Sequence, residues 1–234
     1  MALPQLNSSP QYTTKIPSTG LEISYRPYLV KEEKVLMIAF ETGDQKQALR
    51  AIVDTMNACI TDDIDITKLT TFDVEYLFTQ IRSKSVGEVA TVLLSCSSCE
   101  HKNEVDVDLS TIEVVNGDKS NIIQLTDDIS VEMQYPSYKS IMNLDMEKQN
   151  TELGFEMLIN CVGAICTEEE RIDTRDIKRQ DVQDFIEQMT TEQFKRVSDF
   201  MSDMPVVKKD ITFPCVSCNE TNNHTLQGIN DFLS

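Results

Sequence analysis

Basic residues are scarce in this chain of 234 residues. There are 21 lysines and arginines against 39 aspartates and glutamates, which gives a formal net charge of −18. A surface this acidic repels phosphates instead of neutralising them, so electrostatic binding of nucleic acid is disfavoured. A protein partner with a basic surface would suit the chain better.

Long apolar runs are also missing. No stretch of about 18 apolar residues occurs, and the beginning of the chain, MALPQLNSSPQYTTK, has neither the charged start nor the apolar centre of a secretory signal. We therefore expect neither membrane insertion nor secretion, but a cytosolic protein. The 40% of hydrophobic residues suffice for the core of one large domain or two small ones.

Motifs for catalysis are absent as well. The sequence has no glycine-rich phosphate loop, no Gly-x-Ser-x-Gly and no His-Glu-x-x-His, and it contains only two histidines. Acid–base chemistry would have to rest on carboxylates that no motif places. We expect that the protein is not an enzyme.

The first third of the chain has the spacing of amphipathic helices, with apolar residues every three or four positions. The clearest such stretch, residues 44–60, includes Cys59 among its apolar positions, so this cysteine should face a core. Residues 1–20 are rich in Pro, Ser and Thr and should form an extended N-terminal arm. Residues 21–85 should be mainly helical.

The spacing of the apolar residues changes after the first third of the chain. Five short β-branched runs between residues 86 and 135 predict an antiparallel meander, and helical spacing then returns from residue 151. We expect an α+β fold in which residues 86–135 and 206–234 form a small antiparallel sheet with zinc-ribbon-like knuckles. Residues 136–205 should be a helical insert of about three helices. Two pairs, Thr70 with Asp73 and Thr190 with Gln193, are spaced as capping boxes at helix starts.

The most specific motif is a pair of Cys-x-x-Cys turns, formed by Cys96 with Cys99 and by Cys215 with Cys218. Each turn follows a strand-like run and precedes a polar hairpin tip. Such a turn supplies two corners of a tetrahedron, and two turns complete the four-thiolate shell of a structural zinc site, which leaves no position for water. We therefore predict one structural Zn²⁺, held by these four cysteines. Closing the long loop between the turns costs only about 2 kcal/mol more than usual, against about 10 kcal/mol from a structural zinc.

Other uses of the cysteines have weaker support. Seven cysteines, an odd number, are unlike a secreted disulfide framework. Two metal-free pairs, or a redox dithiol, remain alternatives, although a redox pair usually opens a helix and these run into polar turns. His101 and His224 stand beside the pairs, and we interpret both as bystanders. The three remaining cysteines are interpreted as core residues with the wrong spacing for a turn: Cys59, Cys161 and Cys166.

Three segments resemble the baseplate hub subunit family of T-even-type myoviruses: KIPSTGLEISYRPYLVKEEKVLMIAFETGD, LTTFDVEYLFTQIRSKSVGEVATVLLSCSSC and FMSDMPVVKKDITFPCVSCNETNNHTLQGINDFL. The most specific parts are the run from Arg26 to Lys34 and the second Cys-x-x-Cys with Leu226, Gly228 and Phe232 after it. One departure is the ending INDFLS, where two adjacent aromatic residues would be expected.

The resemblance implies a late viral protein that helps to build the hub of a contractile-tail baseplate by binding other hub or tail proteins. Assembly would take place in the host cytoplasm, and presence in the virion stays open. Partner contacts could come from the N-terminal arm, the C-terminal tail, or Tyr25, Arg26 and Tyr28, whose residue types are enriched at interfaces. The alternative is that both tyrosines pack under the first helix.

A second function remains possible on the residues alone. Zinc ribbons also occur in cytosolic adaptors of nucleic-acid or transcription machinery. The net charge of −18 and the lack of a patch of five or more basic residues count against this alternative.

Overall fold

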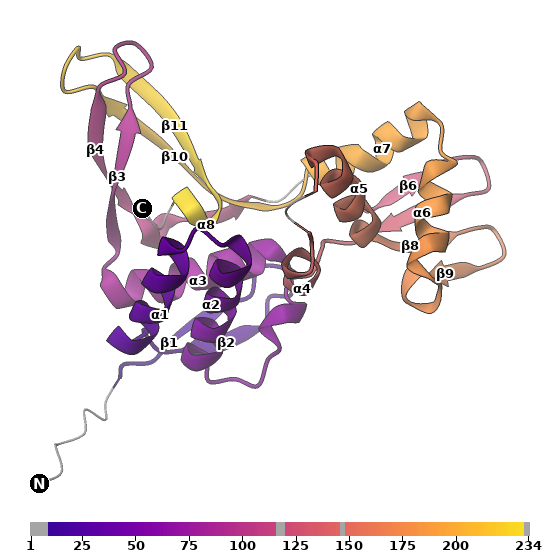
Figure 1. Cartoon of the computed structure of the whole chain (residues 1–234), viewed down its shortest axis with the longest axis horizontal. Helices are drawn as coiled ribbons and strands as arrows, with labels where there is room; N and C mark the ends of the chain where they lie inside the picture. Colours follow the sequence, from indigo (N-terminus) through magenta and orange to yellow (C-terminus); the bar gives the residue numbers. More distant parts are fainter. Residues whose placement is uncertain (1–8, 116–119, 146–147, 232–234) are drawn as a thin grey trace, which may run out of the picture. The chain divides into compact units, whose positions relative to one another are not determined.

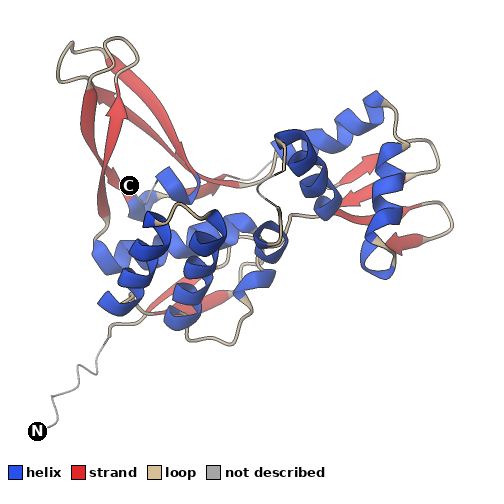
Figure 2. Ribbon diagram, viewed as in Figure 1, coloured by secondary structure: helices blue, strands red, loops and turns tan. Residues whose placement is uncertain are grey.

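The computed structural model describes residues 9–115, 120–145 and 148–231. The chain divides into two compact units, of which unit 1 comprises Met1–Val115 and Val206–Ser234 and unit 2 comprises Asn116–Pro205. Figure 1 shows both by sequence colour, and Figure 2 shows that each combines helices with strands. Unit 1 is therefore built from two separate stretches of sequence.

Unit 1 begins with the hairpin of β1 (Tyr12–Lys15) and β2 (Glu22–Tyr25) and continues with α1 (Val30–Glu41), α2 (Gln45–Cys59), the short 3-10 helix η1 (Ile66–Lys68) and α3 (Thr71–Val86). The capping box of Thr70 and Asp73 is confirmed at the start of α3. The core between these elements is mainly apolar, and its fully buried members include Ile16, Ile23, Ile52, Met56, Leu77 and Phe78.

The described part of the predicted N-terminal arm is built into unit 1. Residues 12–15 form β1, and the Ile16 side chain is 1% exposed. The Ser18 amide and hydroxyl donate hydrogen bonds of 2.9 and 2.6 Å to the carboxylate of Asp73 on α3. Gly20, with φ of 71°, provides the left-handed turn of the hairpin. Residues 12–15 are extended as expected, but the segment reaches the core at Ile16, and its proline and serine lie in a tight turn. Residues 1–8 of the expected arm lie outside the described residues.

The rest of unit 1 is a ribbon of two hairpins. One hairpin joins β3 (Val89–Ser95) to β4 (Lys102–Asp108), which runs into the 3-10 helix η2 (Leu109–Thr111). The other joins β10 (Val206–Pro214) to β11 (Thr221–Gln227), with β5 (Glu113–Val115) on the other edge of β10. A last helix, α8 (Gly228–Asp231), follows β11, and α3 contacts both η2 and α8.

Unit 2 is not a purely helical insert. It contains an antiparallel sheet in the order β6 (Ile122–Gln124), β7 (Ser130–Met133), β8 (Val162–Cys166) and β9 (Arg171–Asp173). Its helices are α4 (Tyr138–Met142), α5 (Asn150–Cys161), α6 (Arg179–Glu187) and α7 (Thr191–Ser202), with the 3-10 helix η3 (Thr174–Asp176). The capping box of Thr190 and Gln193 at α7 is confirmed. The core includes Val131, Leu158, Val162, Ile186, Val197 and Phe200.

Strand β8 explains why the expected meander is divided among several sheets. The helical spacing that returns at residue 151 continues to Ile165, but α5 ends at Cys161 and the next four residues are all buried in β8. A short buried run cannot be distinguished from helix by periodicity alone. Gly163 marks the strand, because a Cβ there would lie 3.2 Å from the Glu132 carbonyl oxygen on β7. Strands β6 and β7 therefore pair within unit 2 and not with the ribbon.

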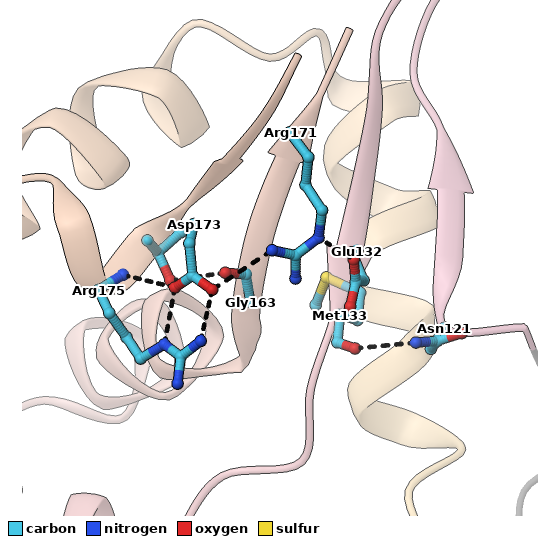
Figure 3. A network of polar contacts seen from close by, with 8 residues as sticks. Asn121, Glu132, Met133, Gly163, Arg171, Asp173 and Arg175 are labelled. Atoms are coloured by element: carbon cyan, nitrogen blue, oxygen red, sulfur yellow. Dashed lines mark hydrogen bonds and ion pairs between the residues drawn. The ribbon is translucent and has the colours of Figure 1, made fainter.

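A polar network covers one end of this sheet (Figure 3). The Arg171 side chain donates hydrogen bonds to Glu132 at 2.8 Å and to Asp173 at 3.3 Å, and the first of these links β9 to β7 across β8. The guanidinium and the amide of Arg175 also donate to Asp173, and these bonds hold the pKa of its carboxyl well below the ordinary value. Beside this network, Asn121, which directly precedes β6, donates to the Met133 carbonyl oxygen on β7.

Candidate metal centre

The tips of the two ribbon hairpins bring the four predicted cysteines together. The first knuckle, residues 96–103, follows β3, and the second knuckle, residues 215–222, follows β10. In Figure 1 the two tips lie at the same end of the ribbon. Cys96 and Cys215 are buried, whereas Cys99 and Cys218 are exposed.

The spacing of the sulfur atoms suits a tetrahedral metal ion. The four Sγ atoms all lie within 4.8 Å of one another. Cys96 Sγ lies 3.7 Å from Cys218 Sγ, and Cys99 Sγ lies 3.7 Å from Cys215 Sγ, so each short contact joins the two knuckles. Sulfurs at about 2.3 Å from a common tetrahedral centre are about 3.8 Å apart. The four thiols can therefore serve as the ligands of one metal ion.

The backbone of the two knuckles follows the same path. The Glu100 amide donates to the Cys96 carbonyl oxygen at 3.0 Å, and the Asn219 amide donates to the Cys215 carbonyl oxygen at 2.9 Å. Glu100 and Asn219 have φ of 58° and 59°, in the left-handed region. This turn reverses the chain after the second cysteine and points both sulfurs of a knuckle to one side.

Backbone amides also stabilise the thiolate form at the first cysteine of a knuckle. Amide groups of Cys99 and Ser98 donate to the Cys96 sulfur, the latter at 3.4 Å, and they lower the pKa of the Cys96 thiol to about 6. The Ser217 amide donates in the same way to Cys215 Sγ at 3.4 Å, and the pKa of Cys215 is also lowered, although burial opposes the shift. Metal ligation requires this deprotonated form.

Two asparagines connect the knuckles crosswise. The Asn103 side-chain oxygen accepts a hydrogen bond of 2.9 Å from the Val216 amide, and the Asn222 oxygen accepts one of 2.9 Å from the Ser97 amide. Both asparagines are 2% exposed. Asn222 also accepts from the Ser97 hydroxyl at 2.9 Å and donates to Cys96 Sγ at 3.5 Å. We did not anticipate these residues, although each stands seven positions after the first cysteine of its knuckle.

Comparison with known proteins decides the family. The sequence pattern of the T4 bacteriophage base plate proteins matches residues 9–234, which is nearly the whole chain. The chain belongs to this family. No curated protein and no solved structure matches the chain. The expected resemblance is thereby confirmed, and it supports a structural role in a phage tail baseplate and interaction with other baseplate or tail proteins.

The remaining cysteines of this baseplate protein do not join the sulfur cluster. Cys59 and Cys161 are fully buried, and burial raises the pKa of their thiols to about 11 and about 12. Inert core residues behave in this way. His224 Nε2 lies 3.1 Å from the Ser95 carbonyl oxygen, and the metal-capable group in the described part of the chain contains cysteines alone.

The tyrosines considered for partner binding are placed differently from that expectation. Tyr25 is 2% exposed, and burial raises the pKa of its hydroxyl to about 12. Arg26 pairs with Glu32 at 3.1 Å, and the Tyr28 amide donates to the Ser85 hydroxyl at 2.9 Å. Tyr25 is therefore a core residue, whereas Tyr28 is only partly buried.

Within the described residues, no helix is long and apolar enough to cross a membrane.

Proposed function

We propose that this baseplate protein is a structural subunit or assembly protein of the baseplate hub. Membership of the family, over residues 9–234, is the observation that carries the proposal. The assignment to the hub rests on the resemblance of Arg26–Lys34 and of the closing Cys-x-x-Cys segment to hub subunits. The protein would bind other hub or tail proteins in the host cytoplasm and act without chemistry of its own.

We also propose that Cys96, Cys99, Cys215 and Cys218 hold one structural Zn²⁺. Four thiolates at tetrahedral spacing are the donor set of structural zinc sites, which leave no open position for catalysis. The metal, when bound, would supply cross-linking and no reaction. The crossed asparagines orient the two knuckles toward each other, so much of the site geometry is built from hydrogen bonds.

The zinc site would hold together a ribbon assembled from distant parts of the sequence. The hairpin of β3 and β4 precedes unit 2, and the hairpin of β10 and β11 follows it. Only their tips bear the cysteines, so the bound metal would join the two hairpins at the end farthest from α3. The zinc site would therefore maintain the shape of a binding protein and would take no part in a reaction.

The nucleic-acid adaptor remains the weaker candidate. The exposed face of β4 carries Glu104, Asp106 and Asp108 beside the exposed Val89 and Leu93 of β3. Carboxylates in this arrangement repel a phosphate backbone. Family membership likewise favours a role among tail proteins.

The decisive experiment is purification of the tagged protein from infected cells, followed by mass spectrometry of its partners. We expect hub or tail-tube proteins to be recovered. Recovery of polymerase subunits or nucleic acid, without tail proteins, would contradict the hub assignment. Elemental analysis of the same sample should find about one zinc per chain, and a folded protein without metal would contradict the zinc site alone.

A further inference from the structure

The outer side of α1 carries apolar side chains that the described part of the protein leaves uncovered. The inner side of the helix buries Leu36 and Ala39, whereas Val30, Met37 and Ile38 are 78%, 57% and 52% exposed. A surface helix normally has one apolar stripe, which faces its own core. A second, contiguous stripe on the outside is typical of an interaction surface.

Two charged residues flank the centre of this outer face. Lys34, Met37, Ile38 and Glu41 stand at positions i, i+3, i+4 and i+7, so they share one side of α1. Neither Lys34 nor Glu41 takes part in an ion pair among the residues that the structure describes. They are separated by about 10 Å of helix rise, too far to pair with each other. Both charges are thus available to a partner.

The order of these four residues is self-complementary. The midpoint between Lys34 and Glu41 is also the midpoint between Met37 and Ile38. If a second copy lies antiparallel about a two-fold axis through that point, Lys34 faces Glu41 of the second copy, and Met37 faces its Ile38. Each charge then faces one opposite charge, so the interface contains two ion pairs, and Met37 and Ile38 of both copies meet at the axis, as an isologous interface requires.

We propose that the outer face of α1, comprising Val30, Lys34, Met37, Ile38 and Glu41, is the surface through which two copies of this protein associate. The local charge is balanced there, although the whole chain has a net charge of −18. Two copies can therefore approach through α1 (Figure 1), because the charges elsewhere are screened over about 8 Å at physiological ionic strength. A purely acidic face would instead have suited a basic partner.

The size of the helix sets the strength of this association. Twelve residues of α1 span about 18 Å. An interface of one helix pair lies at the small end for specific complexes, so the dimer should be reversible. The inference stands apart from the proposed zinc site and from the hub assignment, since it rests only on the surface of α1.

A charge-swap experiment tests the proposal. Sedimentation equilibrium of the full, metal-loaded chain at about 0.15 M salt should show a monomer–dimer equilibrium. Lys34→Glu places carboxylates opposite each other at both ends of the interface, and Glu41→Lys does the same with ammonium groups. Each single variant should weaken the dimer about tenfold or more. The double variant Lys34→Glu/Glu41→Lys should restore it to within about threefold, because both ion pairs re-form with reversed sign.

Lys195→Glu on α7 is the matched control, since it makes the same charge change on an exposed residue of unit 2 and should leave the dimer unchanged. All substituted residues are exposed, and circular dichroism with metal analysis confirms that each variant is folded. A chain that stays monomeric up to about 200 µM would overturn the proposal. So would a double variant as weak as the single ones, which would place the contact with another protein or another face.

Discussion

The two knuckles reach the same geometry from sequences that agree at only half of their positions. The first reads CSSCEHKN and the second CVSCNETN, with identical residues at the two cysteines, at Ser98 and Ser217, and at Asn103 and Asn222. The shared cysteines and asparagines are the positions whose side chains make the site. The other positions contribute mainly backbone groups, so their side chains can differ between the two knuckles.

The knuckles also differ in how their asparagines are used. Each asparagine accepts from an amide of the other knuckle and donates to a carbonyl oxygen two residues earlier in its own hairpin. Asn222 also contacts the Ser97 hydroxyl and the Cys96 sulfur, whereas Asn103 also donates to the Leu94 carbonyl oxygen. The hairpins end differently as well, on the buried Leu109 in one case and on Gly228 near Glu75 in the other. These differences allow the symmetry of the ribbon to be tested one group at a time.

Loss of a buried cysteine should have the largest effect, and it should be equal in both knuckles. Cys96→Ser and Cys215→Ser should each lose the metal and lower the free energy of unfolding by about 5 kcal/mol, or more than about 10 °C in melting temperature. A chelator should do the same to the unsubstituted protein. Metal content and thermal unfolding are measured together.

The control for the cysteine variants is Cys161→Ala in the core of unit 2. It should cost stability through lost packing and keep the full metal content. If Cys215→Ser retained one metal ion per chain, the four-thiolate site would be wrong.

Removal of an asparagine should be the next largest effect, and here the knuckles should differ. Asn103→Ala leaves one buried amide without a partner, which costs about 1–3 kcal/mol. Asn222→Ala also removes a partner of the Ser97 hydroxyl and of Cys96 Sγ, so it should cost about 1 kcal/mol more. Urea unfolding of the metal-loaded variants measures both. Equal costs would show that the extra contacts of Asn222 contribute nothing.

The carboxyl of Glu75, on α3, should make the stability depend on pH. Burial raises its pKa from 4.5 to about 7. A carboxyl with a raised folded-state pKa contributes most below the unfolded-state value, and its contribution is lost as the pH rises through about 7. Glu75→Gln should therefore be more stable than the unsubstituted protein by about 1–2 kcal/mol at pH 8. The difference should shrink toward pH 5, and a constant difference would contradict this explanation.

The smallest effect should come from the left-handed residue of each knuckle. The left-handed backbone conformation costs more free energy for a glutamate than for an asparagine, because the short asparagine side chain tolerates it. Glu100→Gly should stabilise the protein by about 0.5–1 kcal/mol, whereas Asn219→Gly should change the stability by less than that. Chemical denaturation measures the free energy of unfolding of both variants. A larger gain in stability for Asn219→Gly than for Glu100→Gly would contradict this explanation.

Features that depend on neighbouring residues followed from the sequence, whereas features that depend on distant residues did not. Signals between neighbouring residues were reliable, as the capping boxes at Thr70 and Thr190 show. The strand after Cys161 was missed, because a buried run fits a helix and a central strand equally well. The sequence also did not indicate that part of the arm before residue 20 is fixed to unit 1, because Asp73, more than fifty residues away, accepts the hydrogen bonds that hold the turn.

The sequence by itself determined which residues could ligate a metal, because two Cys-x-x-Cys turns, each after a strand-like run, together supply the four thiolates of a structural metal site. It also indicated the baseplate family, which the match over residues 9–234 confirmed. Only the tertiary structure decided the crossed asparagines, the assignment of β6 and β7 to unit 2, and the second apolar face of α1. Each of these depends on which distant segments pack together, and local propensity and spacing carry no information about that choice.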